Sequence, residues 1–223
     1  MVGPFAWFKW VALFKDWTVF AEGFGITALV ALLGLCLSLI LGIIFGVLGA
    51  SQQKFAHKLS RFYVEIIQNT PLVIQVFFLY NGLPKFGIVL PVLWVGIIGV
   101  GLYHGAYIAE VIRAGIQATP RGQREAALSQ GFTYWEAMRY IILPQAKRVV
   151  FPPLTNQAVF LIKNTSVMAM VAGGDLMYRA DSWSSTNIFY GPAYVVTGLL
   201  YFALCFPLAQ LARRLERKSE VTA

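Results

Sequence analysis

Hydrophobic residues in this chain gather in long, almost uninterrupted runs that are separated by shorter polar connections. A helix needs about 20 residues to cross the hydrocarbon core of a bilayer, and five of the runs reach that length. The pattern therefore predicts an all-α membrane protein with five transmembrane helices. These helices are expected at residues 24–50, 62–83, 92–114, 148–171 and 192–212.

The first 22 residues follow a different pattern, in which large aromatic side chains alternate with charged ones, as at Trp7, Lys9 and Trp10. Such a mixture is typical of a helix that lies in the membrane interface. The chain is then expected to divide into three segments: an N-terminal interfacial segment at 1–22, a transmembrane domain at 23–213, and a basic cytoplasmic tail at 214–223.

Composition agrees with this interpretation. Of the 223 residues, 58% are hydrophobic and 13% are charged, and the mean hydropathy is +0.65. Ordinary soluble domains carry about 25% charged residues, so the expected surroundings are the lipid bilayer. The net charge of +8 sits in short clusters between apolar runs, which does not indicate a nucleic-acid-binding face. Cys36 and Cys205 lie in apolar runs with no histidine at ligand spacing, so no metal site is predicted.

Lysine and arginine are divided unequally between the two sets of connections. Thirteen stand on the side that holds residues 115–146, four stand on the other side, and Lys163 lies inside the fourth run. Cytoplasmic connections carry the excess of positive charge. The N-terminus is therefore expected outside and the C-terminus in the cytoplasm, as an odd number of spans requires.

The longest polar connection, residues 115–146, contains the start and stop signals of a short helix. Thr119 followed by Pro120 is typical of an N-cap with proline at the first helical position. Gly131 is typical of a left-handed stop. The sequence therefore predicts a first cytoplasmic helix that includes Glu125.

A second short helix is expected to follow in the same connection. Thr133 and Glu136 have the spacing of a capping box, and Pro144 is expected to end the helix. Two short helices outside the bilayer cannot bury their apolar faces alone. They need either lipid headgroups or a partner protein, so the connection is predicted to be a docking element.

Several motifs in this order resemble a known family. Glu125-Ala126-Ala127, Gly131 and Leu143-Pro144 match without a gap the EAA motif of ABC-importer membrane subunits. The stretches EIIQNTPL at 65–72 and AYIAEVIRAG at 106–115 resemble the second and third spans of the polar-amino-acid permease family. One departure is Gln68, where the family often has an arginine just before Asn69. The resemblance covers roughly residues 20–215.

The resemblance implies a coupling helix that fits a groove on a separate ABC ATPase subunit. Glu125 would pair with a basic residue of that groove, Ala126 and Ala127 would permit close approach, and Gly131 would set the angle between the two helices. Leu143 and Pro144 complete the expected coupling set. For the alanines alone, ordinary helix propensity is an alternative explanation.

Further partners are implied by the same resemblance. They are a second permease chain, in a homodimer or a heterodimer, and an extracytoplasmic amino-acid-binding protein, with the chain in a bacterial plasma (inner) membrane. No GxxxxGK[ST] phosphate loop occurs in the sequence, so ATP would be bound and hydrolysed by the partner subunit. No catalytic residue, metal or cofactor is expected in this chain, which is not expected to be an enzyme.

Polar side chains inside a span are costly and usually face a cavity or a partner. The fourth run contains Asn164, Thr165 and Ser166, which are the first choice for substrate contact. Lys163 could neutralise a substrate carboxylate, or it could contact a dimer partner or extend to the interface. Because no acid stands among these residues, neutral polar or acidic amino acids are favoured as substrates.

A second polar group lies in the second run, where Gln68, Asn69 and Thr70 precede Pro71, and these three residues are also expected to contact the substrate. The proline is expected to break the helix and expose backbone polarity that a cavity can use. Gln68 and Gln75 are seven residues apart and are expected to share a face that lines the passage. A simple packing kink at Pro71 is the alternative.

Two other classes of function are less favoured. A membrane-embedded enzyme would need paired carboxylates or a metal cluster, yet Glu65 and Glu110 are the only acids in the runs, and both lie near arginines. Glu110 and Arg113 are spaced to form an ion pair, and His104 has no second ligand nearby. A secondary transporter would need an inverted repeat, which five spans in one chain lack, although dimerisation could supply the symmetry.

Overall fold

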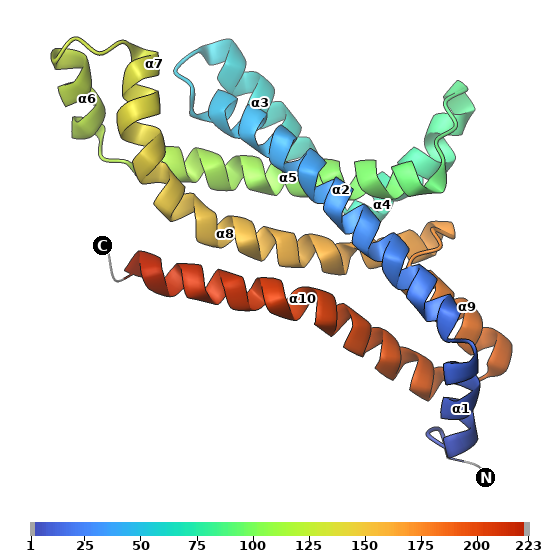
Figure 1. Cartoon of the computed structure of the whole chain (residues 1–223). Helices are drawn as coiled ribbons and strands as arrows, with labels where there is room; N and C mark the ends of the chain where they lie inside the picture. Colours follow the sequence, from blue (N-terminus) through green and yellow to red (C-terminus); the bar gives the residue numbers. More distant parts are fainter. Residues whose placement is uncertain (1–2, 221–223) are drawn as a thin grey trace. The chain divides into compact units, whose positions relative to one another are not determined.

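The computed structural model describes residues 3–220, with the backbone alone at 215–220, so residues 221–223 of the expected basic tail lie outside the described residues. Every regular element in the described range is a helix, and no strand occurs there (Figure 1). In chain order the elements are α1 (Trp7–Lys15), α2 (Trp17–Ala50), α3 (Lys54–Gln68), α4 (Leu72–Phe77), η1 (Phe78–Gly82), η2 (Leu83–Phe86), α5 (Val92–Ala118), α6 (Arg121–Ser129), α7 (Tyr134–Ala137), η3 (Met138–Ile142), α8 (Leu143–Asn164), η4 (Thr165–Val171), α9 (Leu176–Asn187) and α10 (Tyr190–Glu220).

Three helices are long and apolar enough to cross a membrane: α2, α5 and the first 25 residues of α10. Two further pairs reach that length together but are bent. The bend is 97° between α3 and the segment from α4 to η2, and 48° between the segment from α7 to η4 and α9. Each bent pair can form one span, which gives up to five spans in the described residues. The predicted all-α membrane fold is confirmed.

Contacts divide the chain into two compact units, and each is described by itself. Unit 1 contains residues 1–36, 71–101 and 159–207, and unit 2 contains residues 37–70, 102–158 and 208–223. The helices α2, α5, α8 and α10 contribute residues to both units.

The core of unit 1 forms where α1 and α9 lie beside the first turns of α2 and α10 (Figure 1). The ring centroids of Phe20 and Trp183 are 5.6 Å apart in an edge-on contact there. Because α2 begins at Trp17, residues 17–22, which were expected in the N-terminal segment, form the first turns of α2. The buried residues of this core are Leu13, Phe20, Leu176, Ala180, Trp183, Ala193 and Val196.

The connection after the fourth predicted span contains a helix, α9, that the sequence did not predict. Asp175 caps its first turn, because the Oδ2 atom accepts a hydrogen bond from Met177 N at 3.1 Å. We call α1, the first turns of α2, α9 and the start of α10 the α9 region. Three hydrogen bonds stabilise this region, and their partners are separated by 149 to 167 residues of sequence. They join Leu176 N to Thr27 Oγ1 (3.0 Å), Arg179 Nη1 to Glu22 Oε2 (2.6 Å) and Trp183 Nε1 to Asp16 Oδ2 (2.8 Å).

The core of unit 2 lies where α5 packs against the helix that runs from η3 into α8. Side chains of α3 also bond to backbone carbonyls of the neighbouring helices. The Ser60 hydroxyl donates to Phe45 O at 2.6 Å, and the Tyr63 hydroxyl donates to Leu102 O at 2.7 Å. The buried residues of this core are Ile108, Ile112, Ile116, Met138, Ile142, Ala146 and Val150.

The helix break predicted before Pro71 is confirmed. Helix α3 ends at Gln68, and α4 begins at Leu72 after the 97° bend. The prediction that Gln68 and Gln75 share a face is wrong, because seven-residue spacing places two side chains together only along one continuous helix.

Two boundary predictions in the loop at 115–146 are also wrong. Helix α6 begins at Arg121, with Pro120 and not Thr119 at the N-cap. The second loop helix does not end at Pro144 but continues through η3 into α8. In the π-turn η3, Leu143 N bonds to Met138 O five residues back. The backbone hydrogen bonds have therefore already shifted from the four-residue α-helical spacing just before Pro144. Because Pro144 lacks an N–H, it fits at this irregular position, and the helix continues past it.

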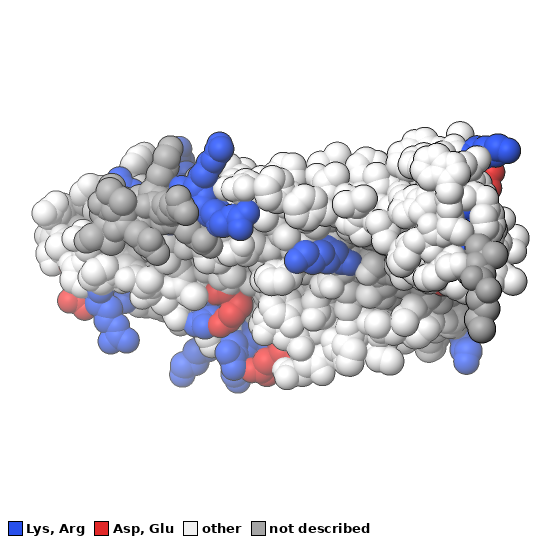
Figure 2. Space-filling view, turned by 90° about the horizontal axis from the view of Figure 1, so that it is seen from below, with Lys and Arg blue, Asp and Glu red and all other residues white. Residues whose placement is uncertain are grey.

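The surface agrees with a membrane environment. On the face in Figure 2, uncharged side chains cover most of the described surface, and Lys and Arg stand in small groups. Leu32 and Ile40 of α2 and Leu199 and Phe202 of α10 are among the exposed apolar side chains. Extensive exposed apolar surface of this kind marks contact with lipid or with other protein.

Candidate functional site

The predicted substrate residues of the fourth span lie where the helix changes type. Helix α8 ends at Asn164, and the tighter 3-10 turn η4 begins at Thr165. The Thr165 hydroxyl donates to Ile162 O at 2.7 Å, and the Ser166 hydroxyl donates to Lys163 O at 2.8 Å. These hydroxyls therefore bond to carbonyls at the transition between the two kinds of helix.

The four residues differ in exposure. Lys163 is exposed, with its Nζ atom 5.6 Å from the centroid of the Phe160 ring, while Asn164 and Ser166 are half-buried. Thr165 is fully buried. Only three of the four side chains therefore reach a surface in this structure, and Thr165 is placed to support the turn beneath them.

An open hollow of about 300 Å³ lies beside this polar turn in unit 1. Lys163 and Ser166 form one side of it, and Tyr194, Thr197 and Tyr201 of α10 contribute to the other. The sequence did not point to these α10 residues, because hydroxyl groups scattered through an apolar span carry no spacing signal. The Tyr194 hydroxyl donates to Asp181 Oδ1 at 2.7 Å, which connects the hollow with α9.

Tyr201, which lines the hollow, also lies next to the buried polar residues Thr27, Thr165 and Asp175, and we call these four residues the polar cluster. Thr27 Oγ1 accepts from Leu176 N, and Asp175 Oδ2 accepts from Met177 N. Among the described residues, Asp175 Oδ1 and the Tyr201 hydroxyl lack a hydrogen bond of ordinary geometry. Tyr201 thus connects the buried polar atoms with the candidate substrate surface.

The second predicted group, Gln68, Asn69 and Thr70, lies at the end of α3 in unit 2. Gln68 Nε2 donates to Ala106 O at 3.3 Å, Asn69 Nδ2 donates to Glu65 O at 2.8 Å, and Thr70 Oγ1 donates to Ile66 O at 2.8 Å. Asn69 and Thr70 thus bond to carbonyls of the last turn of α3, and Gln68 bonds to a carbonyl of α5. Because this group and the residues of the fourth span belong to different units, a common substrate site for the two stays a prediction.

The coupling loop, residues 115–146, has the two-helix form that its sequence predicts. Gly131 has a φ of +88°, and a paired set of hydrogen bonds ends α6: Phe132 N to Ala127 O and Gly131 N to Leu128 O, both 3.1 Å. This is a Schellman ending, in which the left-handed residue is usually glycine. The loop therefore turns sharply at Gly131.

The predicted capping box opens α7. Glu136 N donates to Thr133 Oγ1 at 3.3 Å, and Thr133 N donates to Glu136 Oε2 at 2.8 Å. The pKa of the exposed Glu136 carboxyl lies below its ordinary value. The main cause is the hydrogen bond from the backbone N–H of Thr133, and the hydrogen bond from the Thr133 hydroxyl has a smaller effect in the same direction. Both ends of the turn at Gly131 are thus held by local hydrogen bonds.

The predicted coupling residues lie at different depths. Glu125 and Ala126 are exposed on α6, whereas Ala127 is buried. Leu143 is half-buried and Pro144 is exposed. The apolar side chains of Leu128, Trp135 and Tyr140 are also exposed, and the Trp135 side chain is 70% exposed. The loop therefore presents exposed apolar side chains together with two exposed acidic residues, Glu125 and Glu136.

Two remaining sequence expectations concern ionisable side chains in α5. Arg113 pairs with Glu110, with Nε 2.8 Å from Oε2, as predicted. His104 is buried, and its Nδ1–H donates to Gln157 Oε1 at 3.1 Å. Within the described residues, no three His, Cys, Asp or Glu side chains are grouped as metal ligands.

Comparison with known proteins gives a consistent answer. Residues 38–221 match the family model described as "binding-protein-dependent transport system inner membrane component". The chain is 42% identical over 208 residues to the probable glutamine ABC transporter permease protein GlnM of Bacillus subtilis, covering 93% of this chain and 96% of that protein. It is 30% identical over 216 residues to the glutamine transport system permease protein GlnP of Escherichia coli K12, covering 96% and 99%.

Solved structures are similar as well. A crystal structure of an amino acid ABC transporter with histidines matches with a TM-score of 0.86 and 32% identity, covering 94% of this chain and 98% of that one. The MetNI methionine ABC transporter in an inward-facing conformation matches with a TM-score of 0.64 at 17% identity, covering 88% and 94%, which shows a shared fold.

Proposed function

The chain belongs to the family of binding-protein-dependent transport system inner membrane components, and on that premise we propose that it is the permease subunit of an ATP-driven importer of polar amino acids. In this proposal it forms the translocation path with a second permease and couples to separate ATPase subunits through the loop at 115–146. An extracytoplasmic binding protein delivers the substrate. Membership in a family of transport components sets aside the membrane-enzyme alternative.

The observation that carries the proposal is the exposed face of α6. Glu125 and Ala126 are exposed, while Ala127 is buried and anchors the helix. A small side chain at Ala126 permits a partner backbone to approach closely, and Glu125 offers a charge to a basic groove. The exposed Leu128 and Trp135 add apolar area, and a large aromatic residue is a common anchor in protein interfaces.

The coupling loop is also continuous with the helix that carries the candidate substrate residues. From Tyr134 onward the chain is helical through α7, η3 and α8 to Asn164. Leu143 and Pro144 lie inside this continuous stretch. A displacement imposed on α7 by an ATPase therefore acts on the same helix that ends at Asn164, which is the kind of rigid-body transmission that packed interfaces allow.

For substrate contact we propose Lys163, Asn164 and Ser166 at the hollow in unit 1, with the buried Thr165 supporting the turn. Gln68, Asn69 and Thr70 are proposed as a second polar group along the path. Lys163 supplies a positive charge for a carboxylate, and Asn164 offers both a donor and an acceptor. This chemistry favours neutral polar or acidic amino acids.

The orientation proposed from charge places the N-terminus outside and the C-terminus in the cytoplasm of a bacterial inner membrane. The α9 region then faces the extracytoplasmic side, where the binding protein docks. The coupling loop faces the cytoplasm, where ATP is available to the partner subunit.

The coupling proposal is tested by charge reversal in the reconstituted complex with its ATPase. Glu125→Lys is expected to lower substrate-stimulated ATP hydrolysis about tenfold or more, because like charges brought together at an interface cost several kcal/mol. Gln130→Lys is the matched control, since it places a lysine at the exposed C-cap of the same helix, although it changes the net charge by one unit instead of two. Stimulation that survives in Glu125→Lys would sink the docking proposal, and transport without any ATPase would indicate a secondary carrier.

The substrate proposal is tested separately by Asn164→Asp. A new carboxylate at the hollow is expected to shift preference from glutamine towards arginine in a binding assay on the purified complex. If the ratio of the two affinities does not change, Asn164 does not contact the substrate side chain.

A further inference from the structure

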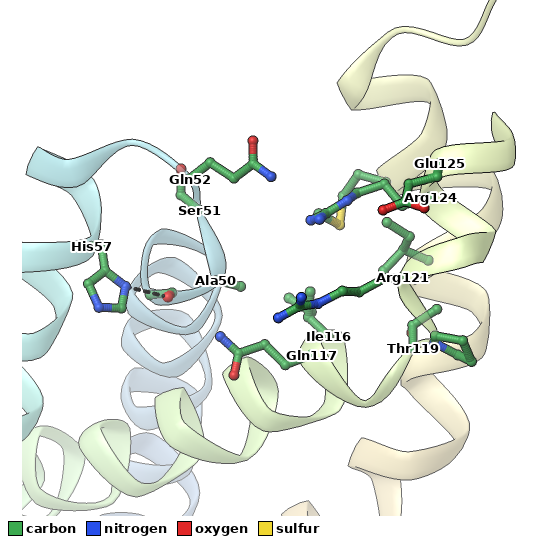
Figure 3. A pocket seen from close by; sticks show the side chains of 14 residues that line it. Ala50, Ser51, Gln52, His57, Ile116, Gln117, Thr119, Arg121, Arg124 and Glu125 are labelled. Atoms are coloured by element: carbon green, nitrogen blue, oxygen red, sulfur yellow. Dashed lines mark hydrogen bonds between the residues drawn. The ribbon is translucent and has the colours of Figure 1, made fainter. Parts of the chain in front are cut away.

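A cavity of about 580 Å³ opens in unit 2 between the turn joining α2 to α3 and the helices α5 and α6. Figure 3 shows Arg121 and Gln117 reaching into this space from one side and Gln52 reaching towards it from the other. Arg124 also points into it. Four side chains that can donate hydrogen bonds thus converge on one space.

The two arginines carry an uncompensated charge. Neither Arg121 nor Arg124 forms an ion pair with any carboxylate among the described residues, and Glu125 is the single acid that lines the cavity. With two guanidinium groups and one carboxylate, the lining keeps one net positive charge. Guanidinium groups bind phosphate through paired hydrogen bonds, so the cavity is suited to a phosphate-bearing anion.

A second hollow, of about 460 Å³, adjoins the first. It shares Ser51, Gln52 and Met138 with the cavity, so the two have a common wall. Its other lining is mainly apolar and contains the indole ring of Trp135. The remaining lining residues are Val47, Leu48, Gln53, Ala56 and Tyr134. A basic cavity beside an apolar hollow matches a ligand with an anionic head and a hydrocarbon tail.

The place of the two hollows along the chain agrees with such a ligand. They lie at the end of α2 and the end of α5, where apolar spans give way to the basic connections. Helix α3 begins at the same level and exposes Phe55 beside Lys54 and Lys58. Aromatic and basic residues together are typical of the headgroup layer, and basic pockets of cytoplasmic helix ends bind anionic lipid headgroups.

We propose that the cavity and the adjoining hollow bind one anionic phospholipid of the inner leaflet. Its phosphate lies between Arg121 and Arg124 with hydrogen bonds from Gln52 and Gln117, and the first part of an acyl chain lies along Trp135. A soluble phosphate shares the headgroup chemistry but leaves the apolar hollow empty. The proposed lipid site shares Glu125 and Trp135 with the face of the coupling loop that is proposed to dock on an ATPase, so it is tested on the chain without an ATPase.

The test uses the purified full chain in detergent, from which the native lipid has been removed. A single kind of lipid is then added, and the lipid molecules that remain bound to the chain are counted by native mass spectrometry. We expect one palmitoyl-oleoyl phosphatidylglycerol to be retained at concentrations where phosphatidylcholine is not. Inorganic phosphate in large excess is expected not to displace it. Because no ATPase is present, the result does not depend on whether the coupling proposal holds.

Variants assign the two halves of the site. Arg121→Gln and Arg124→Gln are each expected to weaken phosphatidylglycerol retention about tenfold, the effect of losing one charged hydrogen-bonding group. Trp135→Ala is expected to weaken it about threefold by removing apolar area. The matched controls are Arg139→Gln and Tyr140→Ala, in the same loop but outside both hollows, and they are expected to leave retention unchanged.

Three results would overturn the inference. The first is unchanged retention in the Arg121→Gln, Arg124→Gln double variant. The second is displacement by inorganic phosphate, which would assign the cavity to a soluble anion. The third is stoichiometric release of the lipid when the ATPase is added, which would assign the cavity to the protein interface.

Discussion

The coupling loop in unit 2 and the α9 region in unit 1 are each stabilised by hydrogen bonds of their own. The two sets of hydrogen bonds differ greatly in how many residues of sequence separate the bonded partners. In the loop, the capping box joins Thr133 to Glu136, three residues apart, and the turn at Gly131 is closed by bonds across three and five residues. In the α9 region, the hydrogen bonds to Thr27, Glu22 and Asp16 cross 149 to 167 residues. One region can form from a short segment, whereas the other requires both ends of the chain.

This difference suits the proposed roles. A loop with its own caps and turn keeps its shape while its outer face stays exposed for a partner. A region assembled from α1, α2, α9 and α10 keeps the polar turn at Lys163 and Ser166 at a fixed place beside Tyr201. The general lesson is that local hydrogen bonds preserve a docking shape, while long-range bonds preserve a binding surface.

The largest loss of stability is expected where α2 meets α9. A Cβ atom added at Gly23 would lie 2.9 Å from Leu176 Cα, so neither backbone can yield without separating the helices. Gly23→Leu is expected to destabilise the chain by about 3 kcal/mol, the upper part of the usual range for overpacking. The measurement is thermal unfolding in detergent.

Gly25→Leu provides the control for this prediction. Gly25 lies in the same helix two residues away, with nothing within 4 Å of an added Cβ atom. That variant is expected to be neutral or slightly stabilised, because leucine is the better helix former. Equal destabilisation of the two variants would show that the helical position, not the contact with α9, sets the cost.

The reach of the contacts also explains how much could be predicted from the sequence. The hydrophobic runs, the break before Pro71, the turn at Gly131 and the capping box all depend on neighbouring residues, and all were predicted. The continuation of the helix through Pro144 was not, because the π-turn before it leaves no signature in residue types.

The candidate substrate surface was only partly predictable for the same reason. Polar residues at Lys163 to Ser166 stand out inside an apolar run, but the run does not show that Thr165 is buried. The contributions of Tyr194 and Tyr201 depend on the packing of α10, some 30 residues further along. Helix α9 has one local signal, the N-cap Asp175 after two glycines, but one capping residue does not by itself predict a helix.

A second prediction compares two buried threonines of unit 1. Thr27 Oγ1 accepts a long-range bond from Leu176 N, whereas the Thr197 hydroxyl donates to Ala193 O within its own helix. Thr27→Val leaves a buried N–H without its acceptor and is expected to cost about 2 kcal/mol. Thr197→Val removes no acceptor from a buried donor and is expected to cost less than half of that.

Urea or thermal unfolding of the two variants in detergent measures this difference. Thr197→Val also lines the hollow, so stability and not transport is the quantity to compare. A larger loss in Thr197→Val than in Thr27→Val would contradict the importance assigned to long-range hydrogen bonds.

A third prediction concerns the turn of the coupling loop. Gly131 has a φ of +88°, which costs an L-residue roughly 1–2 kcal/mol, so Gly131→Ala is expected to destabilise the loop by about 1 kcal/mol. Gly122→Ala, inside the exposed helix α6 with no neighbour near the added Cβ atom, is expected to stabilise it by a few tenths to 1 kcal/mol.

Hydrogen exchange of the amides of α6 and α7 measures this pair, because it reports the loop apart from the spans. The two variants should shift protection in opposite directions. A shift in the same direction would mean that the turn at Gly131 does not hold its left-handed conformation in the free chain.

The smallest expected effect is the pH dependence of the capping box. Hydrogen bonds from the backbone N–H and the hydroxyl of Thr133 hold the pKa of Glu136 below its ordinary value of 4.5. A carboxyl whose pKa is lowered on folding contributes stability that is fully present above the ordinary value and is lost as the pH falls through the lower, folded value. Hydrogen-exchange protection at the start of α7 should therefore be higher in the wild-type chain than in Glu136→Gln at neutral pH. The gap should close below pH 4.5, because glutamine keeps the hydrogen bonds but not the charge. A gap that stays constant across this range would show that the shape of the capping box, and not the carboxylate charge, holds this end of the loop.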